Sequence, residues 1–178
     1  MKKSRYNLIT GLITTAIVTA LLIWSVISVT NGDPLWFLQR FDARAETLII
    51  YWDGNVTTLE HGDGAYEPVM AAFAAAMAAP AGFENGAVLT EEAIEAHREQ
   101  YRMLEVHFAE PIQAHTRHPY AESATFLVPL SERHTRLRRV YAFRGLVPYT
   151  SGPLNLEPSS FDALVRAVEG AVSVASAK

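Results

Sequence analysis

The chain contains no cysteine among its 178 residues. Disulfide bonds, zinc sites built from thiolates, thiol catalysis and lipid attachment through an N-terminal cysteine are therefore excluded. Familiar motifs of nucleotide binding and acyl transfer are also missing: the sequence has no P-loop, no G-x-G-x-x-G turn, no G-x-S-x-G elbow and no S-x-x-K. The lack of a catalytic signature favours a protein that is not an enzyme.

Positive charge is scarce beyond the N-terminal segment. Lys2, Lys3 and Arg5 precede a long apolar run, which leaves 12 basic residues against 19 acidic ones in the rest of the chain, a net charge of −7. An acidic domain is repelled by phosphate backbones, so nucleic-acid binding is not expected.

The apolar run covers residues 8–29 and contains no charged residue. As a helix, these 22 residues span about 33 Å, enough to cross a hydrocarbon core of roughly 30 Å. A cleaved signal peptide usually has a shorter apolar region, about 7 to 15 residues, that ends in a small-x-small cleavage site. Here the run ends in WSVISVTNGDP, without such a site. The pattern therefore favours a retained transmembrane signal-anchor over a cleaved signal sequence.

The basic N-terminal flank predicts the orientation of this anchor. The positive-inside rule keeps the flank in the cytoplasm and places the rest of the chain on the other side of a cell membrane. We therefore expect a single-pass protein with a cytoplasmic segment 1–7, a transmembrane helix 8–29, a juxtamembrane segment 30–46 and an extracytoplasmic, or periplasmic, domain 47–178.

Two features of this region have alternative interpretations. Trp36, Phe37 and Phe41 lie either at the outer headgroup layer, where aromatic residues are enriched, or in the core of the domain. Within the span, Gly11, Thr15 and Thr19 recur every four residues. Small residues at this spacing let another helix approach closely, although they are also ordinary occupants of a membrane span. The face is a candidate packing surface for a second copy of the chain or for a larger membrane protein.

The domain reads as strands grouped with strands and helices grouped with helices. Asp53-Gly54 favours a type I′ hairpin with Trp52 opposite Asn55. Apolar residues at helical spacing predict three helices, and alternating apolar residues predict three further strands. The expected helices lie in 66–79, 90–102 and 159–172, and the further strands in 104–109, 124–130 and 139–149. This order predicts an α+β fold with a mainly antiparallel sheet of about five strands packed by about three helices.

Histidines are the first candidates for metal binding. Glu105 and His107 share one face of a predicted strand, and His115 and His118 follow within eleven residues. Imidazole and carboxylate ligands suit zinc, iron or copper. No spacing here matches an established metal motif, so we expect neither metal nor cofactor, and these four residues remain the alternative.

The most distinctive polar stretch is SERHTRLRRVYAFR. It concentrates five arginines within an acidic domain: Arg133, Arg136, Arg138, Arg139 and Arg144. Guanidinium groups hold carboxylates or phosphates through paired hydrogen bonds, so an acidic partner surface, a lipid headgroup or a small anion would fit. The alternative is a solvated loop whose arginines pair with carboxylates of the domain itself.

Three classes of function follow from these features. The first is a non-catalytic, membrane-anchored extracytoplasmic protein that acts through protein–protein contact, such as an accessory subunit of a larger membrane complex. Its partners would be the bilayer through residues 8–29 and a membrane protein or a second copy of the chain. The second is a membrane-tethered enzyme or metal-binding protein that uses the His107/His115/His118 region. The third is a ligand-binding or sensing domain that acts through a partner helix.

Overall fold

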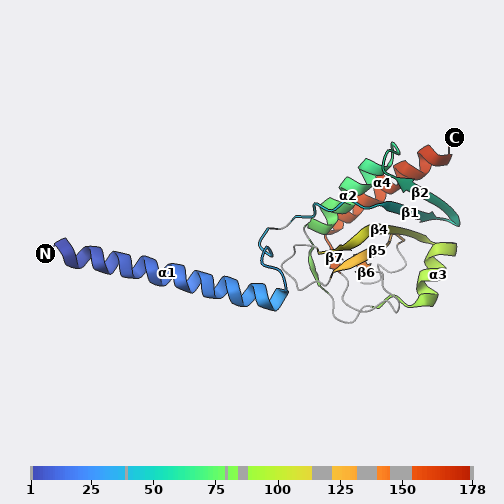
Figure 1. Cartoon of the computed structure of the whole chain (residues 1–178). Coiled ribbons are helices and arrows are strands. Elements are labelled where there is room, and N and C mark those ends of the chain that lie inside the picture. The colour runs from blue at the N-terminus through green and yellow to red at the C-terminus, as the bar shows by residue number, and fades with distance from the viewer. Residues whose placement is uncertain are drawn as a thin grey trace.

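The computed structural model describes residues 2–38, 40–78, 80–83, 88–113, 122–131, 140–144 and 154–176. Its first element is the 30-residue helix α1 (Lys2–Asn31), which projects from one end of a layered domain (Figure 1). The helix is longer at both ends than the predicted span 8–29.

The described part of the domain contains both strands and helices. In chain order they are β1 (Thr47–Trp52), β2 (Asn55–Glu60), α2 (Tyr66–Ala78), β3 (Gly82–Phe83), α3 (Glu91–Gln100), β4 (Arg102–Ile112), β5 (Ser123–Pro129), β6 (Val140–Arg144), β7 (Leu154–Leu156) and α4 (Pro158–Ser176). The described residues form one sheet of order β2-β1-β4-β5-β6-β7-β3, and every neighbouring pair in it is antiparallel. The predicted α+β class and the antiparallel sheet are confirmed.

The number of strands differs from the prediction. The described residues contain seven strands instead of about five, because β3 and β7 were not expected. With two and three residues, these strands are too short to show an alternating pattern. β4 is also longer than the predicted 104–109, and its pairing with β5 shifts register between His107 and Ile112. Pro111, which has no N–H to donate to the ladder, lies within this irregular stretch.

The β1–β2 hairpin forms as predicted. Trp52 pairs with Asn55, and the two turn residues Asp53 and Gly54 have φ values of 49° and 83°. A type I′ turn requires positive φ at both positions. Arg102 holds the turn from outside, because its guanidinium donates two hydrogen bonds to the Asp53 carboxylate and lies 4.0 Å from the centre of the Trp52 ring.

The main core lies between one face of the sheet and the helices α2 and α4 (Figure 1). At its centre Phe41 makes edge-to-face contacts with Phe73, Phe108 and Phe126, with ring centres 5.5 to 6.4 Å apart. Such pairs stabilise a core by about 0.5–1.5 kcal/mol each beyond the burial of their area. Of the two interpretations given for Phe41, the structure supports the core residue.

The opposite face of the sheet carries a smaller core beneath α3. Thr90 caps this helix by accepting a hydrogen bond from Ala93 N. Ile94 packs there with Met103 and Leu127. Only two residues of α3 are buried, and the polar part of this sheet face contains the charged cluster described below.

Candidate functional site

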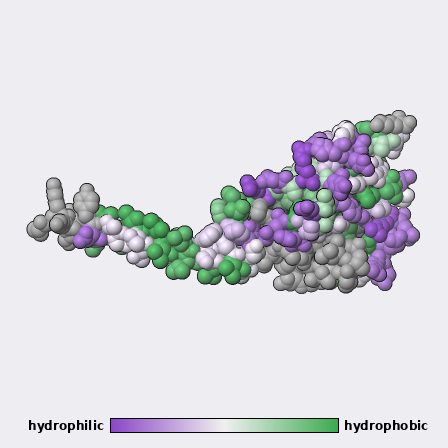
Figure 2. All heavy atoms as spheres, in the orientation of Figure 1, coloured by the Kyte–Doolittle hydropathy of each residue, from purple (hydrophilic) through white to green (hydrophobic). Residues whose placement is uncertain are grey.

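The apolar helix is the most prominent feature of the molecular surface. Residues Asn7–Thr30 have a mean hydropathy of 2.3, and all of them are exposed except Ile27 and Ser28, which are partly buried. Large apolar side chains are exposed all round the helix, among them Leu8, Ile13, Ile17, Leu22 and Val26. Figure 2 shows apolar residues along much of the face turned toward the viewer. A helix that is apolar all round is stable only in an apolar environment. α1 is long and apolar enough to span a membrane.

A hydrogen-bonded turn ends the helix. Gly32 has a φ of 65°, Asp33 N donates to Ser28 O, and Gly32 N donates to Val29 O. This pair of bonds, with a left-handed glycine just after the helix, is a Schellman motif. The Gln113 side chain, which follows β4, donates to Gly32 O at 3.1 Å. The end of the helix is therefore attached to the sheet by a hydrogen bond as well as by the chain.

Gly11, Thr15 and Thr19 lie along α1, and all three are exposed. At 100° per residue they stay within 80° of one another, so they form one narrow face. A Cβ atom added at Gly11 would have no neighbour within 4 Å. The face is thus accessible to another helix along its whole length.

Four polar side chains meet on the α3 side of the sheet. Glu105 of β4 is 3% exposed at its side chain, and its Oε1 accepts a hydrogen bond from Arg98 Nε at 2.8 Å. Its Oε2 lies 3.2 Å from His107 Nε2. On the far side of the imidazole, His107 Nδ1 lies 3.4 Å from the Thr125 hydroxyl. These contacts form a continuous chain from guanidinium to carboxylate, imidazole and hydroxyl.

The elements of the fold explain how these residues meet. Glu105 and His107 are two positions apart on β4 and so point to the same face, as their spacing predicted. Thr125 is paired with His107 across the β4–β5 ladder, and Arg98 belongs to the last turn of α3. Because a carboxylate only accepts hydrogen bonds, His107 Nε2–H donates to Glu105.

The Glu105 carboxyl is held in its ionised form. Burial alone raises its pKa, but the hydrogen bonds from His107 and Arg98, together with the positive charge of Arg98, outweigh this effect and leave the pKa below its ordinary value. A carboxylate of lowered pKa is a weak base. Glu105 is thus suited to orienting His107, whose side chain is 36% exposed and is the accessible group of the pair.

The predicted metal ligands are only partly described. Glu105 and His107 come together, whereas His115 and His118 lie outside the described residues. Within the described ranges no group of three or more potential ligands is present. Arg98 also contacts the same carboxylate, and its positive charge opposes a bound cation.

The arginine stretch falls mostly outside the described ranges. Arg133, Arg136, Arg138 and Arg139 are not described, and Arg144 belongs to β6, where it pairs with Phe126 of β5. The contact predicted for these arginines therefore stays a prediction.

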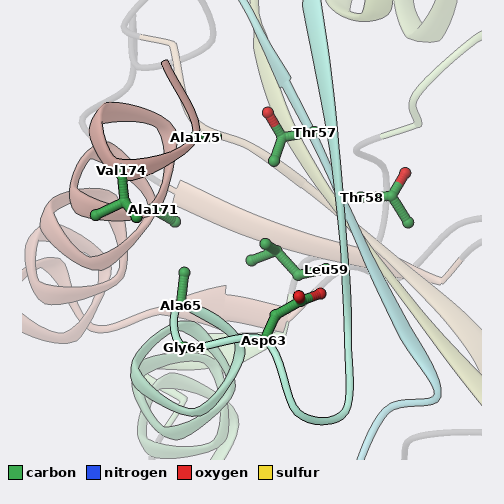
Figure 3. Close-up of a pocket in the computed structure, with 9 residues that line it drawn as sticks. All are labelled: Thr57, Thr58, Leu59, Asp63, Gly64, Ala65, Ala171, Val174 and Ala175. Carbon is green, nitrogen blue, oxygen red and sulfur yellow. The ribbon is translucent and has the colours of Figure 1, made fainter. Parts of the chain in front are cut away.

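A shallow groove of about 270 Å³ lies between β2, the start of α2 and the end of α4 (Figure 3). Leu59, Ala65 and Ala171 line it with apolar side chains. Asp63 is the one titratable residue among the nine that line the groove, and its carboxylate accepts a hydrogen bond from Glu60 N within the turn before α2. The groove is therefore a concave site whose lining residues offer little chemical reactivity.

Arg98 and Thr125 were not among the candidates from the sequence. A basic residue in the last turn of a helix usually complements the helix dipole, so Arg98 carried no signal of a long-range ion pair. Thr125 is a common type of strand residue, and only the β4–β5 register places it beside His107.

Comparison of the chain with protein-family models, with curated proteins and with solved structures found no match. Its function must therefore be inferred from the residues described above.

Proposed function

We propose that this chain is a single-pass membrane protein whose α+β domain lies outside the cytoplasm and acts by contact with another protein, as an accessory subunit of a larger membrane complex. The observation that carries the proposal is the α1 helix, which exposes apolar side chains on all sides and which the described part of the domain leaves uncovered. Water is an unfavourable environment for such a surface, and a bilayer is a favourable one.

The charge distribution supports the orientation. Lys2, Lys3 and Arg5 precede the span, and Asp33 follows it. By the positive-inside rule, the basic end stays in the cytoplasm. The domain then lies on the outer side of the membrane. A chain without cysteine has no thiol that an oxidising environment there could modify.

The charged cluster around the buried Glu105, within the described residues, favours a function in protein contact over a function in catalysis. The Glu105 carboxylate is occupied by Arg98 and His107, and its lowered pKa makes it a poor proton acceptor. The accessible face of Gly11, Thr15 and Thr19 instead provides a surface on which a second transmembrane helix can pack.

The test is extraction of the native membrane in mild detergent, followed by sizing and by identification of the proteins that co-purify. We expect a stoichiometric membrane partner or a second copy of the chain. Thr15→Leu should reduce its recovery at least tenfold, because a larger side chain blocks close approach of the helices. Ala20→Leu is the matched control: residue 20 lies about 100° or more around the helix from each of the three small residues, so partner recovery should be unchanged. A monomer in every extract would overturn the proposal.

A second candidate, a metal-binding or catalytic role, has one observation in its favour. Glu105 Oε2 and His107 Nε2 lie 3.2 Å apart, close to the separation of two ligands on one zinc ion. Metal analysis of protein purified without chelators tests this role. About one metal ion per chain, with a lower content in the His107→Ala variant, would establish the metal-binding role in place of the contact function. A metal content near zero would rule out metal binding.

A further inference from the structure

The position of Trp24 in α1 serves as a reference for depth in the proposed bilayer. Trp24 lies seven residues before the last helical residue, Asn31, and thus about 10 Å from the end of the helix. Trp is enriched at membrane–water interfaces, so Trp24 marks the outer boundary of the hydrocarbon core. The last two turns of α1 then lie within the outer headgroup layer.

The chain returns toward this depth after the helix ends. Trp24 Nε1 donates a hydrogen bond to the carbonyl oxygen of Pro34 at 3.1 Å, although the two residues are ten positions apart. A chain that continued along the helix axis would place residue 34 about 15 Å beyond Trp24. The left-handed Gly32 instead turns the backbone sharply, and Pro34 comes to lie beside the helix.

Two hydrogen bonds keep the returning segment 33–38 compact. Leu35 N donates to Asp33 Oδ1 at 2.7 Å, and Leu38 N donates to Leu35 O at 2.8 Å. Asp33 is the only charged residue in the segment, and it is buried. The segment therefore presents no exposed charge that would keep it out of a lipid interface.

The exposed side chains of this segment are apolar. Phe37 is 52% exposed and Leu38 40% exposed, and Trp24, which is bonded to Pro34 of the same segment, is 42% exposed. Half-buried Trp36 supports Phe37 through an edge-to-face contact with ring centres 6.0 Å apart. Single exposed apolar residues are common on protein surfaces, but these belong to a segment that is bonded through Pro34 to Trp24 of the apolar helix α1.

From this arrangement we infer that the segment 33–38 is a second membrane contact, which inserts Phe37 and Leu38 into the outer headgroup layer and fixes the orientation of the domain. The inference rests on the proposed membrane anchor. Gln113 transmits the orientation, because its hydrogen bond to Gly32 O attaches the end of β4 to the membrane-proximal turn. β4 runs about 36 Å from Arg102 to Gln113, so the hairpin tip near Trp52 is held far from the bilayer.

Tryptophan fluorescence in the full-length protein tests the inference. The chain has three tryptophans, Trp24, Trp36 and Trp52. In liposomes whose phospholipids carry bromine near the glycerol end of the acyl chains, quenching reports contact of a tryptophan with lipid. Each probe is read as the difference from a variant that keeps Trp24 and replaces the other two tryptophans with Phe, because Trp24 itself holds Pro34. We expect Trp24 and a Phe37→Trp probe to be quenched to a similar extent. Leu38→Trp provides a second probe should Phe37→Trp fail to fold, which near-ultraviolet circular dichroism will detect.

The matched control is Val56→Trp, another exposed apolar position, located on β2 next to the hairpin turn. This probe and Trp52 should show no quenching by brominated lipid. If Trp24 is quenched but neither probe at 37 or 38 is, the turn lies in water and the inference fails while the anchor stands. If Trp24 is also unquenched, the proposed anchor fails as well. Quenching of Val56→Trp equal to that of Phe37→Trp would overturn the fixed orientation.

Discussion

Arg98 Nε, in the last turn of α3, donates a hydrogen bond to Glu105 Oε1 of β4 at 2.8 Å, and the carboxylate is almost fully buried. α3 buries only Ile94 and His97, so this ion pair is one of few contacts that hold the helix on the sheet. Removing one partner of a buried pair is costly because the remaining charge has left water without full compensation.

Arg98→Met should therefore lower the free energy of unfolding by about 2 kcal/mol, less than the loss of a fully buried pair, because Arg98 is 34% exposed and His107 still contacts Glu105. Urea unfolding of the full chain in mild detergent, followed by near-ultraviolet circular dichroism, measures the loss. Glu95→Gln is the control, since Glu95 is an exposed partner of the same arginine at 3.5 Å, and its loss should cost less than about 1 kcal/mol. Equal effects of the two variants would contradict a dominant role for Glu105.

The same cluster predicts an acid-dependent loss of stability. The pKa of Glu105 is below its ordinary value of 4.5 in the folded chain, because the hydrogen bonds and charge of its partners outweigh the effect of burial. A carboxyl with a lowered pKa contributes stability that is fully present above pH 4.5 and is lost as the pH falls through the lowered value. The folded protein should thus lose stability below about pH 4.5.

Glu105→Gln should make this loss shallower, and stability curves measured between pH 7 and pH 3 would show the change. The acid dependence should persist in part, because hydrogen bonds from Arg102 also lower the pKa of Asp53. Glu95→Gln, which removes an exposed carboxyl that contacts the same arginine, is measured alongside Glu105→Gln. A Glu105→Gln curve that parallels the wild-type curve would show that Glu105 does not carry the effect.

Local patterns in the sequence predicted those parts of the fold that local chemistry determines. Asp53-Gly54 predicted the hairpin and its register, and Thr90 predicted the start of α3. The edge strand β3 was not predictable, because two residues have no periodicity and this strand exists only through its pairing with β7.

The candidate site was predictable only along one strand. Alternation on β4 placed Glu105 and His107 on the same face, but their other partners come from a helix and from a neighbouring strand. Nothing in the sequence around Arg98 indicates which carboxylate it reaches. Equally, a linear reading of WSVISVTNGDP predicts a chain that continues away from the helix, whereas the Trp24–Pro34 hydrogen bond brings it back beside α1.

The hairpin turn gives a test of backbone strain. Gly54 has a φ of 83°, where an L-residue is strained by about 1–2 kcal/mol. A Cβ atom at this position would lie 3.5 Å from Glu99 O, an ordinary contact, so Gly54→Ala should cost about that amount through strain alone. Gly64→Ala is the control: its φ is not positive and its Cβ would meet no atom within 4 Å, so stability should be unchanged or slightly higher. Thermal unfolding of both variants measures the difference, and a neutral Gly54→Ala would contradict the assigned turn.

The arginines at 133–139 give the last prediction, which concerns partner binding. If they contact an acidic partner surface, reversing two charges there should convert attraction into repulsion. The double variant Arg136→Glu with Arg138→Glu should therefore abolish recovery of the partner from detergent extracts, and each single variant should weaken it. Arg166→Glu makes the same change of charge at an exposed position on α4 and should leave recovery unchanged.

The loss should also be reproduced in the unmodified protein by raising the salt concentration, because exposed charges are screened within about 10 Å at 0.1 M ionic strength. Full recovery with the double variant would remove these arginines from the interface and leave the face of Gly11, Thr15 and Thr19 as the remaining candidate.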